Sequence, residues 1–172
     1  MFKVVSNNRQ VNYKKEDLDM DIKQRVFPII RDSCPLERKL GNFFSVAIDF
    51  RFANFSIEPL EESTLDRAIL VNFFEPVFEE DVLDKLDEEC LRPGLPTELA
   101  DLSRSYPDYP ELSKYLQIIA LGESWEGRNR YRYVPCILAG PEGLVLSSTL
   151  LNGVGWNVNT WFLAFYKRFI PV

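Results

Sequence analysis

The sequence predicts an α+β fold, in which a mainly antiparallel β-sheet carries three or four α-helices packed on one side. Three patterns support this class. Apolar and polar residues alternate over 43–57, which is the period of a half-buried strand. Apolar residues over 78–90 recur every three or four positions, which is the period of a helix. The last third of the chain alternates strand-like segments with proline and glycine turns, which favours antiparallel pairing.

The first sixty residues predict a hairpin, a helix and a strand. Residues 2–13 are expected to form a small hairpin around an Asn-Asn turn. Apolar residues over 18–30 fall on one helical stripe, and Pro28 is expected to kink or end that helix. Residues 43–57 form the clearest strand. Its inward side chains are expected to be Phe44, Val46, Ile48, Phe50 and Phe52.

The middle of the chain predicts the remaining helices. Residues 68–74 are almost entirely apolar and fit either a buried strand or a helix. Residues 78–90 predict a strong amphipathic helix, with acids covering its outer surface and an Arg-Pro-Gly stop after it. Two shorter helices are expected over 97–103 and 112–119.

The end of the chain predicts a closing sheet. Residues 131–139 and 144–148 flank a Gly-Pro-Glu-Gly turn and predict a hairpin. Pro135 predicts that the first of these strands lies at an edge or carries a bulge. Residues 161–169 predict a last strand. The chain has 172 residues and no internal repeat, so one globular domain over 1–172 is expected.

Histidine is absent from the chain, which removes several classes of function. Ser-His-Asp and Cys-His catalysis need an imidazole as usually built. Zinc and non-haem iron sites lose their commonest nitrogen ligand. No metal site and no cofactor are therefore predicted, and a catalytic role is disfavoured.

Charge and cysteine content limit the partner and the compartment. The net charge of −6 and the pI of about 4.8 argue against nucleic acid or an anionic membrane as the main partner. No apolar stretch reaches the length of a membrane-spanning helix, and the first residues lack the apolar core of a signal peptide. Three scattered cysteines without a CxxC pattern are typical of a reducing compartment. We therefore expect a cytoplasmic protein.

Negative charge is concentrated in residues 75–89. Eight acids and one base give this segment a net charge of −7, so the rest of the chain is close to neutral. One interpretation is a solvated helix face that keeps the protein soluble. The other is a surface that attracts a basic protein partner. The candidate recognition residues are Glu80, Asp84, Asp87 and Glu88.

Positive charge alternates with aromatic residues over 128–133. If this segment is a strand, Arg128, Arg130 and Arg132 share one face. Guanidinium groups are suited to bidentate contacts with carboxylate or phosphate, and Trp125 just upstream would add an aromatic wall. The alternative is that the arginines pair with acids of this chain or lie in solvent.

Carboxylates offer the one remaining route to catalysis. Pairs of acids hydrolyse glycosides, and two or three can hold magnesium. The candidates are Asp49, on the polar face of the 43–57 strand, and Glu123 and Glu126. Nothing in their spacing brings them within reach of one another.

Two functions follow from these patterns. The first is a non-catalytic, acidic, cytoplasmic protein that binds another protein, of the inhibitor, immunity or adaptor type, with neither nucleic acid nor membrane as partner. The alternative is a binder of a small anionic ligand, or a carboxylate-based enzyme acting on one, with the arginine strand holding the anion. A cleft with the arginines beside Asp49 or Glu123 would favour the alternative, whereas a convex acidic helix would favour protein binding. The oligomeric state is not indicated.

Overall fold

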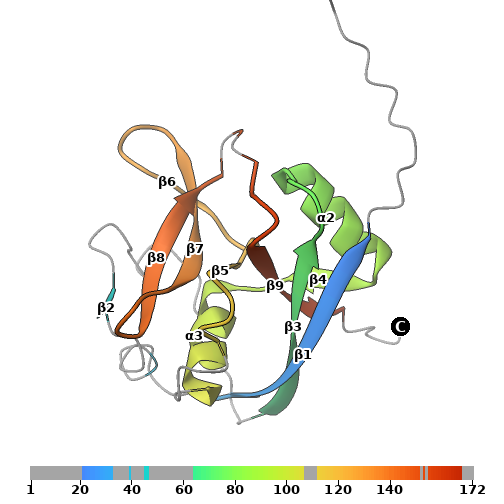
Figure 1. Ribbon diagram of the computed structural model, residues 1–172, viewed down its shortest axis with the longest axis vertical. Helices are drawn as coiled ribbons and strands as arrows, with labels where there is room; N and C mark the ends of the chain where they lie inside the picture. Colours follow the sequence, from blue (N-terminus) through green and yellow to red (C-terminus); the bar gives the residue numbers. More distant parts are fainter. Residues whose placement is uncertain are drawn as a thin grey trace, which may run out of the picture.

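The α+β class is confirmed by a computed structural model, in which one mixed, mainly antiparallel sheet carries helices (Figure 1). The structure describes residues 21–32, 39, 45–46, 64–106, 112–151, 153 and 155–167. In this part of the chain the strands are β1 (Ile22–Arg31), β2 (Ser45–Val46), β3 (Thr64–Phe73), β4 (Leu91–Pro93), β5 (Gln117–Ile119), β6 (Trp125–Glu126), β7 (Arg132–Ala139), β8 (Leu144–Leu150) and β9 (Thr160–Tyr166). The helices are α2 (Glu79–Glu88) and α3 (Pro96–Ser105).

The strand order is β1-β3-β9-β5-β7-β8-β2, with β4 also pairing with β9 and β6 with β7. Two pairs, β5 with β9 and β2 with β8, are parallel, and the others are antiparallel. The last described strand, β9, confirms the closing strand expected from the sequence. It lies inside the sheet, between β3 and β5.

A hydrophobic core lies on each face of the sheet, because successive residues of a strand point to opposite sides. On one face, α3 packs over β3 and β9 through Leu99 and Leu102, and we call this cluster the α3-side core. On the other face, α2 packs over the same two strands through Val82 and Leu86, and we call this cluster the α2-side core. In Figure 1, α2 lies near the top of the view and α3 below it.

The prediction that the helices pack on one side is therefore wrong. The physical reason lies in β3, where residues 68–73 are all buried. A strand that is apolar on both faces needs a cover on both faces. The same segment settles the ambiguity of 68–74, which is a strand and not a helix.

Two of the four expected helices are strands in the structure. The helix expected over 18–30 is wrong in its described part, because Ile22–Arg31 form β1, which pairs with β3 along its whole length. The helix expected over 112–119 is also wrong, because a turn over 112–114 is followed by β5. In both cases, tertiary pairing overrides a local period that fits a helix. The helices expected over 78–90 and 97–103 are confirmed as α2 and α3.

Pro28 is compatible with β1 because β1 is the edge strand of the sheet. The carbonyl oxygen of Pro28 accepts a hydrogen bond from the hydroxyl of Tyr106 (2.9 Å), and the Ser105 hydroxyl accepts one from the Ile30 amide (3.1 Å). Both bonds lie on the open edge, away from β3. The missing N–H of the proline therefore costs the sheet no ladder bond.

The hairpin expected in the last third is confirmed by β7 and β8. The prediction of an edge strand or a bulge at Pro135 is wrong, since β7 lies inside the sheet and its register with β8 is continuous. The carbonyl oxygen of Pro135 accepts a bond from the Ala120 amide (3.1 Å) on the side where the chain passes from β5 to β6. The Pro135 nitrogen faces the same side of β7. There, Pro135 lies between the residues that pair with β5 and those that pair with β6, so its missing N–H removes no bond from either ladder.

Two predictions at the start of the chain lie outside the described residues. The hairpin over 2–13 is one of them. Of the strand over 43–57, the structure describes β2 alone, which pairs in parallel with β8.

Candidate functional site

All four acids predicted to form a recognition surface lie on α2 and are exposed. The inward residues Val82 and Leu86 fix which side of the helix faces the sheet. At the start of the helix, the Asp81 carboxylate accepts a hydrogen bond from the Phe78 amide (3.0 Å). The exposed acids are Glu80, Asp84, Asp87 and Glu88. We call these four residues the acidic ridge.

Part of the charge of α2 is paired within the protein. Lys85 is buried, and its ammonium group lies 3.1 Å from Glu88 and 3.6 Å from Glu89. Asp87 pairs with Lys167, which follows β9. These are pairs with solvated carboxylates, so they leave the ridge accessible and strongly negative. A convex helix holds its acids apart instead of converging them on one point.

The prediction of an arginine strand is wrong. Arg128 and Arg130 lie in the exposed turn between β6 and β7, and Arg130 has a positive φ of 63°. Arg132 begins β7, where it donates to the Ser124 hydroxyl (2.9 Å) and lies 3.6 Å from Glu79. A tight turn replaces the strand because the Gly127 amide bonds to the Tyr131 carbonyl oxygen, which closes the hairpin. The three guanidinium groups therefore do not line one strand face.

Trp125 belongs to the internal packing of the same hairpin. Its ring stacks on Tyr133 with 5.7 Å between centroids and packs against the α3-side core. Asn129 donates to the Tyr133 hydroxyl (2.8 Å) and braces the stack. The tryptophan thus holds β6 on β7.

The candidate carboxylates form no site in the described part of the chain. Glu126 is exposed on β6, Glu123 is half-buried ahead of it, and Asp49 lies outside the described residues. Among the residues that the structure describes, no group of three or more His, Cys, Asp or Glu side chains is placed to hold a metal ion. No helix in the described segments is long and apolar enough to cross a membrane.

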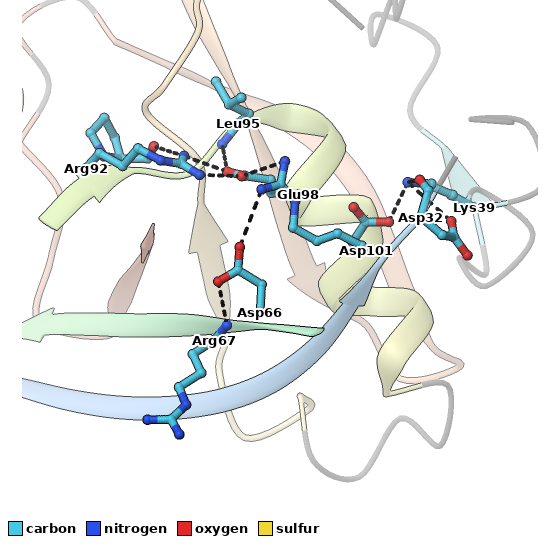
Figure 2. A network of polar contacts seen from close by, with 10 residues as sticks. Asp32, Lys39, Asp66, Arg67, Arg92, Leu95, Glu98 and Asp101 are labelled. Carbon is cyan, nitrogen blue, oxygen red and sulfur yellow. Dashed lines mark hydrogen bonds and ion pairs between the residues drawn. The ribbon is translucent and has the colours of Figure 1, made fainter. Parts of the chain in front are cut away.

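Sequence reasoning missed a buried charge network on α3 (Figure 2). Glu98 is fully buried and is held by three groups. Its carboxylate accepts two bonds from Arg92 (2.6 and 3.0 Å) and one from the Leu95 amide (2.8 Å), and the Arg31 guanidinium lies 3.1 Å away. Such bidentate, charge-assisted contacts are the strongest hydrogen bonds that proteins form.

A second buried acid, Asp101, lies one turn further along α3. Its carboxylate is 2.5 Å from the Lys39 ammonium group, which also donates to the Asp32 carbonyl oxygen (3.0 Å). Asp32 pairs in turn with Arg104. Burial raises the pKa of Asp101 above its ordinary value of 3.8, although Lys39 and Arg31 act to lower it.

The network is balanced, with four acids and four bases among the described residues. They are Arg31, Asp32, Lys39, Asp66, Arg92, Glu98, Asp101 and Arg104. Each carboxylate is held by a cation, so the arrangement attaches α3 to β1, β3 and β4. The available signal was that Glu98 and Asp101 directly precede the inward Leu99 and Leu102 in α3, which places the acids near its apolar stripe.

Two exposed phenylalanines adjoin the beginning of α2. Phe74 is 63% exposed and Phe78 is 53% exposed. Phe78 immediately precedes the helix, and its ring lies against Gly155, where a Cβ atom would be 3.4 Å from the ring. Aromatic side chains next to charged groups are a common composition of protein interfaces.

Comparisons of this chain with protein-family models, with curated proteins and with solved structures give no match.

Proposed function

We propose that this protein is a non-catalytic binding protein, which recognises a basic protein partner through the acidic ridge of α2. The observation that carries the proposal is the difference in burial between the acids of the two helices. The acids of α3 are buried and paired with cations of the chain, whereas the acids of the ridge point to solvent. Exposed charge of one sign steers association with a partner of the opposite sign.

Phe74 and Phe78 would supply the apolar contacts that charge alone lacks. Interface energy is concentrated in a few aromatic anchors, while rim charges mainly set the rate and specificity of association. Two exposed rings at one end of an acidic helix match this division. The inhibitor, immunity or adaptor types remain the classes that we propose, with the cytoplasm as location because of the scattered cysteines.

Charge variants of the ridge test the proposal. The neutralised variant carries Glu80→Gln, Asp84→Asn, Asp87→Asn and Glu88→Gln, and the reversed variant carries lysine at the same positions. Both keep Val82 and Leu86, so α2 should still pack on the sheet. We expect the partner captured by the wild-type protein from native lysate to be weakened by the first variant and lost with the second. Binding of the purified partner should also fall as salt is raised.

A matched control uses the exposed hairpin turn. Changing Arg128 and Arg130 to glutamine removes two exposed charges without touching α2. This control should bind the partner like the wild-type protein. Loss of binding with the arginine variant, together with full binding by the reversed ridge, would contradict the proposal.

A further inference from the structure

Within the part of the chain that the structure describes, α2 covers only the second half of β3 on its face of the sheet. The side chains of α2 pack with Ile69, Val71 and Phe73 in the second half of β3. Leu65, on the same face in the first half of β3, is 79% exposed. In Figure 1, β1 and β3 continue toward the bottom of the view, whereas α2 lies near the top. The helix has ten residues and spans about 15 Å, whereas the ten residues of β3 span about 33 Å.

The edge strand β1 extends this uncovered area. Ile30 lies directly opposite Leu65 in the register and is 55% exposed. Val26, on the same face of β1, is 53% exposed, and Pro28 between them is exposed as well. We call Val26, Pro28, Ile30 and Leu65 the apolar patch. These four neighbouring apolar residues lie around the exposed Arg67, which is opposite Pro28 on the same face. Exposed apolar surface rimmed by polar residues is typical of interaction sites.

The opposite face of the same two strands is covered at this level, where Ile29 and Ala68 are buried in the α3-side core. There, Asp66 and Arg31 take part in the buried network beneath α3. Figure 2 shows the Arg67 side chain directed away from that network. Arg67 follows Leu65 by two residues in β3, so both lie on the same face of the sheet. The ribbon of β1 and β3 is therefore held firmly from one side and is open on the other.

The end of α2 is tied to the end of β9, which is the neighbour of β3 in the sheet. Asp87 pairs with Lys167, and the Lys167 amide donates to the Cys90 carbonyl oxygen (3.0 Å). Tyr166 precedes Lys167 and is exposed on the α2 face of β9. It lies two residues after Ala164, the last β9 residue that pairs with β3. Acids at this end of the ridge thus lie on the α2 side of the uncovered sheet.

We infer that the partner docks an amphipathic helix with basic residues on the apolar patch, alongside α2. The inference rests on the proposed function and names the element that would engage the ridge. A helix is the usual cover for an apolar sheet face, and helices packed side by side lie about 8–10 Å apart. Basic side chains on the flank of such a helix would meet the acids of α2, while its apolar stripe covers Ile30 and Leu65.

Other occupants fit less well. An added strand would need free backbone groups along β1, but Pro28 has no N–H, and Tyr106 and Ser105 already bond to this edge. The α2 helix of a second copy would bring acids against acids, which opposes association. The charge of the ridge therefore selects a partner of a different sequence.

The test uses a synthetic amphipathic helix of leucine and lysine as the probe. A scrambled peptide of the same composition and a leucine–glutamate helix serve as peptide controls. We expect the leucine–lysine helix to bind the full chain and to shift the methyl NMR signals of Val26, Ile30 and Leu65. The double variant Ile30→Thr, Leu65→Thr should weaken binding at least about tenfold. Threonine favours strands, and both sites are exposed, so folding should persist. Leu116→Thr is the matched control, because Leu116 is 61% exposed elsewhere and should leave affinity unchanged.

The outcomes separate this inference from the proposed function. Weaker binding with both the patch variant and the reversed ridge supports both. Weaker binding with the reversed ridge alone overturns the helix-docking inference and leaves recognition by the ridge standing. Weaker binding with the patch variant alone contradicts the role of the ridge and, with it, the inference. If the probe does not bind, or if the scrambled peptide binds equally well, the inference is overturned, while capture of the native partner still tests the ridge.

Discussion

The two described helices have the same length and both carry acids, but the acids of α3 are buried and those of α2 are exposed. On α3, Glu98 and Asp101 are buried against cations from β1, β4 and Lys39. On α2, the acids of the ridge are exposed, even where Glu88 pairs with the buried Lys85 and Asp87 pairs with Lys167. Carboxylates therefore hold the fold together on one face and stay exposed to solvent on the other, where we propose that they bind a partner.

The difference follows from the cost of removing charge from water. A buried carboxylate must recover several kcal/mol of lost hydration through close and well-aligned partners. Glu98 does so with two arginines and a backbone amide. A solvated carboxylate keeps its hydration, so its ion pairs contribute little to stability. Its charge remains available to a partner.

The largest effect expected on stability is from Glu98→Ala. The substitution leaves the guanidinium groups of Arg31 and Arg92 without their shared carboxylate, and removing one side of a buried ion pair costs about 3–5 kcal/mol. Chemical denaturation should show this loss in the free energy of unfolding. Glu80→Ala on α2 is the matched control and should change the value by less than about 0.5 kcal/mol. Equal losses from the two variants would mean that burial does not distinguish the helices.

Truncating a buried leucine should destabilise the protein to a similar extent on either helix, whereas substitutions of the acids should not. Leu86 of α2 and Leu102 of α3 are both buried. Each truncation to alanine removes buried methyl groups and leaves a cavity, which costs about 2–5 kcal/mol. Thermal and chemical unfolding of the two variants should give similar losses. A much smaller loss for Leu86→Ala would show that α2 is only loosely attached to its face of the sheet.

The sequence predicted α2 better than α3 for a physical reason. The position of α2 and of its exposed acids follows from a local period, which a single segment contains. The network on α3 depends on Arg31, Lys39 and Arg92, which lie outside this helix. No local sequence pattern predicts that these residues pair with Glu98 and Asp101. The two helices that proved to be strands fail in the same way. Both β1 and β5 are defined by partners far away in the chain.

The candidate residues show the same limit. Four acids on α2 were correctly predicted to lie on one helix, because helical spacing fixes their relation. The arginines were wrongly placed on one strand face, because a turn begins at Gly127 and interrupts the alternation. Trp125 and Tyr133 stack across that hairpin, which spacing alone does not reveal.

A smaller effect concerns the pH dependence of Asp101. Its pKa is raised in the folded protein, mainly by burial, so the folded state holds this proton more tightly than the unfolded state does. The contribution of Asp101 to stability therefore falls as the pH rises from below 3.8 through the raised pKa. Asp101→Asn cannot ionise, so its free energy of unfolding relative to the wild type should rise across that range. Denaturation of both proteins at a series of pH values measures this difference. The opposite slope would mean that the Lys39 pair outweighs burial.

The smallest effect is expected from Asp87→Asn, which removes the exposed pair with Lys167. An exposed ion pair contributes about 0–1 kcal/mol, because solvent screens it and both side chains lose freedom. At about 1 M salt the screening length is only about 3 Å, so even this contribution should disappear. The loss from Glu98→Gln should persist in the same salt, because the Glu98 side chain is fully buried and salt does not screen its ion pairs in the same way. Unfolding of both variants at low and high salt makes the comparison. If the effect of Asp87→Asn survives high salt while that of Glu98→Gln does not, the assignment of the two faces would have to be reversed.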